Sequence, residues 1–272
     1  MTPNIGQTFR ALHVKGRPFV LANAWDRGSA KMLAALGAQA IATSSAAHAF
    51  TLGRPDGGTL TRDEALAHAA DLCAAVRVPV QGDFENGFGD DPDTCAETVR
   101  LAAEVGLAGI CIEDTILPGD APYDFDLAVE RIKAACAAAR ALPNDFVLTA
   151  RADGVLTGRY DLAEAIRRLQ AFQAAGADCL YAPLIADMAG VAQVCAATSA
   201  AVNVLIAGHT VNHGLVDFAA LGVARLSLGS SLARITHRAI HDAATEMFGA
   251  GQFDLLGHDI PGSQVDALLE QD

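Results

Sequence analysis

The sequence predicts a single α/β domain folded as a (β/α)8 TIM barrel. Eight short apolar runs alternate with Ala-rich segments of helical periodicity, and turn-forming glycines recur between them. No linker, low-complexity tract or charge block divides the 272 residues, a length that α/β barrels often reach as one domain. A doubly wound open sheet is the structural alternative, and the count of eight units argues against it.

The predicted strands are continuous apolar runs, as expected for parallel strands buried on both faces. Their order along the chain gives each strand a following helix, which is the repeating unit of a barrel. The eight runs are Phe19–Ala24, Ala40–Ser44, Val78–Asp83, Gly109–Glu113, Phe146–Arg151, Cys179–Pro183, Val202–Ala207 and Val223–Leu228.

Helix boundaries are marked by capping residues. Thr61 with Glu64, and Asp161 with Glu164, have the spacing of a capping box. Asp91 precedes a proline at the first helical position. Glycines close several helices just before the next strand, where a left-handed residue is needed. The clearest predicted helices are Arg62–Val76, Pro92–Val105, Leu127–Leu142 and Leu162–Ala174.

The chain continues beyond the eighth predicted helix. We expect residues 1–249 to form the catalytic barrel and residues 250–272 to form a C-terminal extension. The extension carries several apolar residues, which suits contact with another subunit better than free disorder.

Composition narrows the possible partners. The net charge of −13 argues against nucleic acid, which requires clustered Lys and Arg. No run of 18 apolar residues and no long apolar N-terminal segment is present, so we expect no membrane span and a cytoplasmic protein. The six cysteines are scattered without a CxxC pair, which predicts buried thiols in a reducing compartment.

Carboxylates follow two successive predicted strands. Asp83 and Glu85 follow the third strand at alternate positions, so their side chains leave the same face, and Glu113 ends the fourth. Like charges in a dry site need a cation or a proton between them, and hard oxygen ligands with room for water suit Mg²⁺. Capping or solvated loop carboxylates are the alternative interpretation.

Further polar residues fall at the predicted C-terminal strand ends, which form the active face of a barrel. Arg151 is placed to contact a substrate or to pair with the carboxylates. Trp25 is expected as a pocket wall, and Asn203 either lines the pocket or bonds within the core. His48 and His209 are candidate bases or exposed loop histidines, and Gly229–Ser231 is a candidate phosphate turn or a plain cap.

Six phrases, taken in order and spacing, resemble the isocitrate lyase/phosphoenolpyruvate mutase superfamily. The resemblance runs from about Phe19 to Met247. It implies a Mg²⁺-dependent barrel, with Mn²⁺ as a substitute, that makes or breaks C–C or P–C bonds beside an α-oxocarboxylate through an enolate. The matching phrases are Leu21–Asp26, Ile41–Ser45, Leu52–Asp56, Gly82–Asp91, Gly109–Asp114 and Thr149–Asp153.

The resemblance also implies residue roles. Asp83, Glu85 and Glu113 would hold the metal, largely through waters, with Asp56 nearby. Ser44 and Ser45 match the segment that grips the substrate carboxylate, and Arg151 matches the arginine that pairs with that carboxylate or the oxyanion. Members are commonly tetramers that exchange the eighth helix, here Leu232–Met247, so we expect a homo-oligomer, either a dimer or a tetramer.

Departures from the superfamily pattern bear on the substrate. The Lys-Lys/Arg-Cys-Gly-His loop of isocitrate and methylisocitrate lyases is missing, because the loop from Asp114 to Phe125 contains no Cys, Lys or His. The Lys-Thr-Asn-Ser-like loop of the phosphonopyruvate enzymes is missing too. Tyr123 is the titratable donor in this loop besides carboxylates, either as a catalytic acid or as a packing residue.

Three functional hypotheses follow. The first is a Mg²⁺-dependent lyase or decarboxylase that cleaves a C–C bond beside an α-oxocarboxylate, in an oxaloacetate-like acid. The second is a phosphonopyruvate-type hydrolase or mutase that breaks or moves a P–C bond. The third is a barrel that binds an oxo-acid without turnover, as loss of the loop residues would allow.

Overall fold

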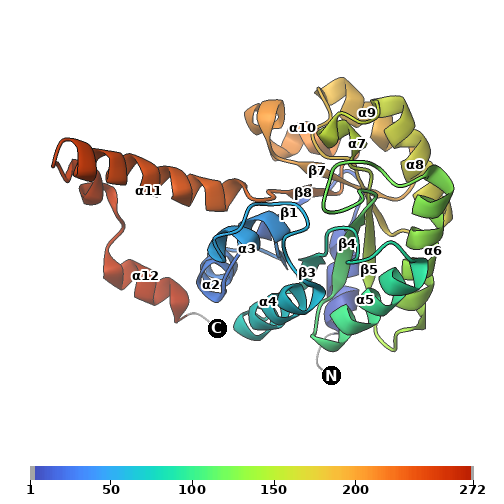
Figure 1. Cartoon of the computed structure of the whole chain (residues 1–272), viewed down its shortest axis with the longest axis horizontal. Helices are drawn as coiled ribbons and strands as arrows, with labels where there is room; N and C mark the ends of the chain where they lie inside the picture. The colour runs from blue at the N-terminus through green and yellow to red at the C-terminus, as the bar shows by residue number, and fades with distance from the viewer. Residues whose placement is uncertain (1–3, 271–272) are drawn as a thin grey trace.

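A computed structural model describes residues 4–270 and shows a closed barrel of eight parallel strands in sequence order (Figure 1). Each predicted strand is present, and the fold prediction is confirmed. β4 coincides with its predicted run, and the other observed strands are shorter than theirs, because those runs include residues of the adjoining turns. They are β1 (Phe19–Asn23), β2 (Ile41–Ala42), β3 (Val80–Asp83), β4 (Gly109–Glu113), β5 (Val147–Arg151), β6 (Cys179–Tyr181), β7 (Ala201–Leu205) and β8 (Arg225–Ser227).

Helices surround the barrel and pack their apolar faces on the strands. The Thr61 and Glu64 side chains accept from each other's backbone N–H groups, as a capping box requires. The Asp161 side chain accepts from the Glu164 N–H, which is one of the two bonds of a capping box. The helices that follow the strands along the chain are α2 (Arg27–Ala35), α3 (Ser45–Thr51), α4 (Arg62–Ala75), α5 (Pro92–Glu104), α6 (Phe125–Ala141), α7 (Gly154–Thr157), α8 (Leu162–Ala174), α9 (Met188–Ala197), η1 (Gly208–Asn212) and α10 (Leu215–Ala220).

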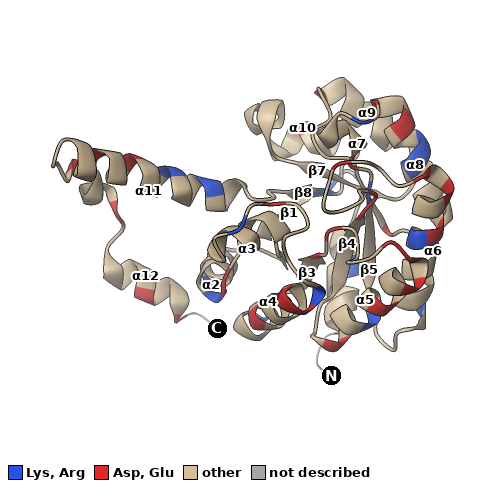
Figure 2. Ribbon diagram, viewed as in Figure 1, with Lys and Arg blue, Asp and Glu red and all other residues tan. Residues whose placement is uncertain are grey.

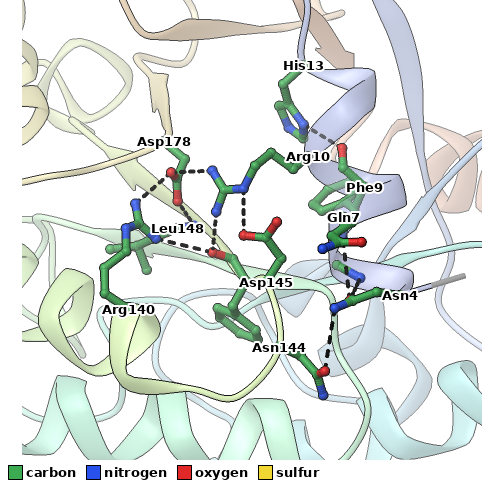
Figure 3. Close-up of polar contacts among 12 residues, drawn as sticks. Asn4, Gln7, Phe9, Arg10, His13, Arg140, Asn144, Asp145, Leu148 and Asp178 are labelled. Atoms are coloured by element: carbon green, nitrogen blue, oxygen red, sulfur yellow. Dashed lines mark hydrogen bonds and ion pairs between the residues drawn. The ribbon is translucent and has the colours of Figure 1, made fainter.

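An N-terminal helix, α1 (Ile5–Leu12), packs against the end of the barrel where the strands begin. Phe9 is fully buried there against Phe19, which stabilises the contact by roughly 1.5–3 kcal/mol. Arg10 donates to Asp145 at 2.8 Å and to Asp178 at 2.6 Å, just before β5 and β6 (Figure 3). This end of the barrel is therefore closed by side chains and does not open to solvent as a pore.

The eighth helix does not cover the barrel. Figure 1 shows α11 (Ser231–Gly249) projecting away from the strands, and Ala233 is its single buried residue. Ile235, Ile240 and Phe248 are 64%, 65% and 87% exposed. The chain then turns back through η2 (Asp254–His258) and α12 (Gly262–Leu269), which contacts α2. The predicted extension thus contains helical structure of its own.

Figure 2 shows Lys and Arg positions interspersed with Asp and Glu positions along α6 and α8. No helix within residues 4–270 is both long enough and apolar enough to cross a membrane.

Candidate active site at the barrel mouth

The predicted site residues meet where the parallel strands end. Asp83 is the last residue of β3, Glu113 of β4 and Arg151 of β5. The register places Glu113 beside Arg151 and Arg151 beside Tyr181, so their side chains point to the same end of the barrel. Glu85 lies just beyond β3 with a φ of 47°, a left-handed conformation that is uncommon for a residue with a side chain.

A cavity of about 360 Å³ opens at this mouth. Its charged lining is dominated by carboxylates, and the sequence-predicted members are Ser44, Ser45, Asp56, Asp83, Glu85, Glu113 and Arg151. The structure therefore brings together most of the residues that the sequence singled out. A volume of this size accommodates a small organic acid with a few water molecules.

Hydrogen bonds hold the individual carboxylates in place. The Ser45 N–H and hydroxyl both donate to Asp83 Oδ2, at 2.9 and 2.8 Å. The Gly58 N–H donates to Glu85 Oε1 at 3.1 Å. The donors of Ser45 are thus engaged by Asp83, so Asp83 must turn toward another partner before Ser45 can grip a substrate carboxylate.

Arg151 lies between two carboxylates. Its guanidinium contacts Glu113 at 3.1 Å, and it donates to Asp153 through both Nε and Nη2, the latter at 3.0 Å. The Tyr181 ring lies 5.5 Å from the guanidinium carbon. These contacts fix the orientation of the guanidinium, which is what bidentate recognition of a carboxylate requires.

The carboxylates at the mouth resist ionisation. Burial raises the pKa of Glu85 to about 7, and the nearby charges of Asp83 and Asp56 raise it further. The pKa of Glu113 is also raised well above its usual value, first by burial and then by Asp153 and Asp83, against the opposing effect of Arg151. Burial and the Asp83 charge raise the pKa of Asp56 as well. A bound cation would relieve this repulsion.

The donor set suits a hydrated divalent cation. Among residues 4–270, no three His, Cys, Asp or Glu side chains converge closely enough to coordinate a metal ion directly. Carboxylate oxygens with a water layer between them and the ion match the preference of Mg²⁺, which keeps several of its waters. The residues therefore fit a cation held largely through water, as the resemblance implied.

Two predicted substrate contacts lie elsewhere. Trp25 is absent from the cavity lining, and its carbonyl accepts from His68 at 2.9 Å. Asn203 is buried inside the barrel, donating to Ser227 at 2.8 Å and accepting from Arg225 at 2.9 Å. Its position corresponds to the second of the two interpretations drawn from the sequence, a hydrogen bond within the core.

Tyr123 also lies outside the cavity lining. It is 2% exposed, its hydroxyl donates to Asp90 at 2.5 Å and accepts from Asn86 at 2.9 Å, and Arg131 covers its ring at 3.9 Å. This geometry matches the packing interpretation of Tyr123 and leaves it without access to a substrate in the cavity.

The candidate histidines are likewise outside the lining. His48 stacks on His68 with ring centroids 3.8 Å apart, and the Nε2 atom of His209 is buried without a partner. Gly229, Ser230 and Ser231 do line the cavity, and Ser230 makes no side-chain capping bond.

Sequence reasoning missed several lining residues, among them Thr115, Tyr181 and Arg234. Tyr181 ends β6, so the rule that identified the other strand ends could have found it. Thr115 follows the carboxylates of β4, but its type alone gives no signal. Arg234 belongs to α11, whose departure from the barrel brings its first turn to the mouth.

Comparison with known proteins shows the family to which the chain belongs. The sequence model of the family described as phosphoenolpyruvate phosphomutase matches residues 9–248. An uncharacterised protein of Mycobacterium tuberculosis is 37% identical over 225 residues, 82% of each chain. An oxaloacetate decarboxylase of Ectopseudomonas mendocina is 30% identical over 253 residues, which cover 91% of this chain and 86% of that protein.

Solved structures also resemble this chain. A Burkholderia cenocepacia structure described as a lyase/mutase has a TM-score of 0.93 and 47% identity, covering 98% of this chain and 95% of its own. The superfamily consists of metal-dependent lyases and mutases. The chain belongs to the phosphoenolpyruvate mutase family, within the isocitrate lyase/phosphoenolpyruvate mutase superfamily.

Proposed function

We propose that this protein is a Mg²⁺-dependent lyase that cleaves a C–C bond beside an α-oxocarboxylate, with an oxaloacetate-like acid as substrate. The observation that carries the proposal is the cavity in which Asp83, Glu85 and Glu113 face the fixed guanidinium of Arg151. The similarity to an oxaloacetate decarboxylase over 91% of the chain supports the choice of substrate class.

Different side chains would bind the cation and the substrate. Asp83, Glu85 and Glu113, with Asp56 at the rim, would hold Mg²⁺ or a substituting Mn²⁺ largely through water. The cation supplies polarisation of the keto oxygen when bound. Arg151, oriented by Glu113 and Asp153, would bind the substrate carboxylate or the oxygen on which enolate charge develops. Ser45 would bind the same carboxylate once Asp83 releases it.

Loop contacts would restrict water at the reacting carbon. Leu117 and Gly119, from the loop after β4, line the cavity. The Gly58 backbone lies so close to Pro118 that an added Cβ would come within 3.0 Å of it. The two loops therefore meet over the carboxylates, and a less hydrated site strengthens each electrostatic contact with the substrate.

The test is a turnover screen with Mg²⁺, in which α-oxo and 2-hydroxy acids and phosphonopyruvate are offered and pyruvate, glyoxylate and phosphate are followed. We expect pyruvate from oxaloacetate above the Mg²⁺-only background, and loss of that activity in Glu85→Ala. The matched control is Glu130→Ala, because Glu130 is exposed on α6 and does not line the cavity. Equal activity in both variants would refute the proposed site.

A P–C bond reaction is the second candidate, and one observation favours it. Ser230, Ser231 and Arg234 line the cavity where α11 begins, so their donors and the helix N-terminus could bind a phosphonate. Release of phosphate from phosphonopyruvate would establish this alternative. If none of these acids is turned over, but oxalate still raises the thermal stability in Mg²⁺, the protein would be a barrel that binds oxo-acids without turnover.

We also propose that the protein is a homo-oligomer in which α11 packs on a second copy. The exposed apolar residues of α11 and of the following segment support this, since such a surface is rarely left in water. Light scattering after size-exclusion chromatography should give a dimer or a tetramer. A monomer at micromolar concentration would contradict the proposal without affecting the assignment of the mouth.

A further inference from the structure

A second and smaller cavity lies inside the barrel. Its volume is about 50 Å³, and each of the eight strands contributes at least one lining residue. Asp83, Arg151 and Tyr181 line both this space and the mouth, so it lies directly inward from the candidate active site. We call it the inner chamber. A cavity needs only about 10–15 Å³ to hold one water molecule, so the inner chamber has room for more.

Arg225 supplies a buried cation to the inner chamber. Its side chain extends from β8, and the residue is 1% exposed. Its guanidinium donates to Asn203 Oδ1 at 2.9 Å and to Gln81 Oε1 at 2.6 Å. Among the ion pairs found between residues 4 and 270, none includes Arg225, although buried charges are normally paired.

The third partner of Arg225 is neutral as well. His13, the residue just after α1, has its Nε2 atom 3.2 Å from Arg225 Nη1. Its other ring nitrogen, Nδ1, lies 2.9 Å from the Phe9 carbonyl and must donate to it, so Nε2 is the acceptor. Burial and the Arg225 charge lower the pKa of His13 to about 3, which keeps the ring uncharged near neutral pH.

Hydrogen-bond donors facing the inner chamber lack acceptors. Gln81 Oε1 already accepts from Arg225 and from Thr149, which leaves the Gln81 amide nitrogen without a partner. Arg225 Nη2 makes no hydrogen bond within the described chain either. Among fully enclosed side-chain polar atoms of residues 4–270, only His209 Nε2 is unpaired, so both nitrogens must border open space. Both residues line the inner chamber, which places this open space beside them.

The remaining ionisable groups around the inner chamber lie toward the mouth. Asp83 accepts from Ser45, and Arg151 is paired with Glu113 and Asp153. Burial raises the pKa of Cys111 and of Tyr181, so both are neutral. The end of the inner chamber formed by Arg225 and Gln81 therefore combines a positive charge with free N–H groups.

We propose that the inner chamber binds a small monovalent anion, of the size of a halide, nitrate, formate or bicarbonate ion, between Arg225 and Gln81. A bound anion supplies the counter-charge that the protein itself does not provide. It also accepts hydrogen bonds from the free N–H groups of Arg225 and Gln81. The anion would bind at the Arg225 end of the inner chamber, whereas Asp83 lies at the end that adjoins the mouth, so its binding does not depend on the reaction at the mouth.

The direct test uses bromide, because its anomalous X-ray scattering distinguishes it from water. Crystals of the wild-type chain soaked in sodium bromide should show an anomalous peak between Arg225 Nη2 and Gln81 Nε2. Ordinary water density there, without an anomalous peak, would overturn the proposal.

Solution measurements use a variant with a built-in counter-charge. Gln81→Glu places a carboxylate beside Arg225, so it should compete with the anion and weaken its apparent affinity at least about tenfold. The readout is the thermal unfolding midpoint in sodium bromide, compared with sodium gluconate at equal ionic strength. Gln252→Glu, which adds the same charge at an exposed position, is the control and should respond like the wild type.

The same measurement separates the possible anions. Bromide, nitrate, formate and bicarbonate should each raise the wild-type midpoint beyond gluconate, and bicarbonate should displace bromide from the crystal if it is the better ligand. A bromide response in Gln81→Glu equal to that of the wild type would contradict binding at Arg225. If that variant fails to fold, the bromide soak of the wild-type crystal still decides.

Discussion

Glu113 and Asp114 are neighbours at the end of β4, yet their carboxylates lie in different environments. Glu113 faces the cavity, where one guanidinium and several like charges surround it and its pKa is raised, first of all by burial. Asp114 accepts from the Asp153 N–H, the Tyr160 hydroxyl and Arg168, at 2.8, 2.8 and 3.0 Å. Burial raises the pKa of both carboxyl groups, but Glu113 has one ion pair among like charges, whereas Asp114 accepts three hydrogen bonds.

The contacts of Asp114 continue into the neighbouring loops. Arg168 also donates to the Tyr123 carbonyl at 3.0 Å, and the Tyr123 hydroxyl reaches Asp90 in the loop after β3. We call Asp114, Tyr123, Tyr160 and Arg168 the loop bracket. Polar residues at a strand end therefore divide into those available to a ligand and those that hold the loops around it.

Replacing Glu113 tests the ligand side of this comparison and should have the largest effect. Glu113→Gln removes one of the charges that face the cation and frees Arg151, so kcat/KM for the accepted acid should fall at least about a thousandfold. The urea unfolding midpoint should stay the same or rise, because repulsion among the carboxylates decreases. Glu130→Gln on the exposed face of α6 is the control, and comparable activity in both would contradict the division.

Replacing Asp114 tests the loop bracket. Asp114→Ala leaves Arg168 buried beside an empty site, so the free energy of unfolding should drop by about 3–5 kcal/mol in urea titrations. Asp114→Asn should lose less, since an amide oxygen still accepts the Tyr160 and Asp153 donors. Full stability in Asp114→Ala would show that the loops are held by other contacts.

The pH dependence of stability should distinguish the mouth from the rest of the chain. Glu85 has a pKa of about 7 in the folded protein against 4.5 ordinarily, so the folded state binds its proton more tightly. Its favourable contribution is complete below pH 4.5 and is lost as pH rises through 7. Without divalent cations, the wild type should therefore become less stable than Glu85→Gln across this range, by up to about 3 kcal/mol.

The measurement is urea unfolding of both proteins from pH 4 upward, with the two free energies subtracted so that other titrating groups cancel. Added Mg²⁺ should reduce the difference at neutral pH, because the cation favours the ionised carboxylate. A difference in unfolding free energy that does not change with pH would mean that the pKa of Glu85 is not raised in the folded protein.

The smallest expected effect is that of Tyr123→Phe, which separates packing from catalysis. Loss of the hydroxyl removes the bond to Asp90 and should cost about 1–2 kcal/mol of unfolding free energy. The value of kcat should change less than about threefold, since Tyr123 does not line the cavity. A loss of kcat of a hundredfold or more, with stability intact, would restore Tyr123 as the proton donor.

The sequence predicted the barrel because strand and helix periods are local signals. It predicted Asp83, Glu85, Glu113 and Arg151 as neighbours because parallel strands end together at one mouth. The sequence did not show whether Asn203 faces the mouth or the interior of the barrel. An inward-facing residue of a strand has the same sequence signal at either depth.

Side-chain contacts between residues far apart in the sequence could not be predicted either. Nothing local shows that the Tyr123 hydroxyl reaches Asp90, that Arg225 lies beside Gln81, or that Asp83 holds the donors of Ser45. The departure of α11 is equally invisible, because its apolar period is the same whether it packs on its own barrel or on another.

The position of α1 has a consequence for biosynthesis. Arg10 of α1 and the adjoining His13 contact Asp145, Asp178 and Arg225, which are 135, 168 and 212 positions away, so this segment meets its last partner only after β8 has been synthesised. Contacts of such separation form late and slowly. During most of translation the amphipathic helix α1 therefore lacks these native partners, which makes it a candidate binding site for chaperones.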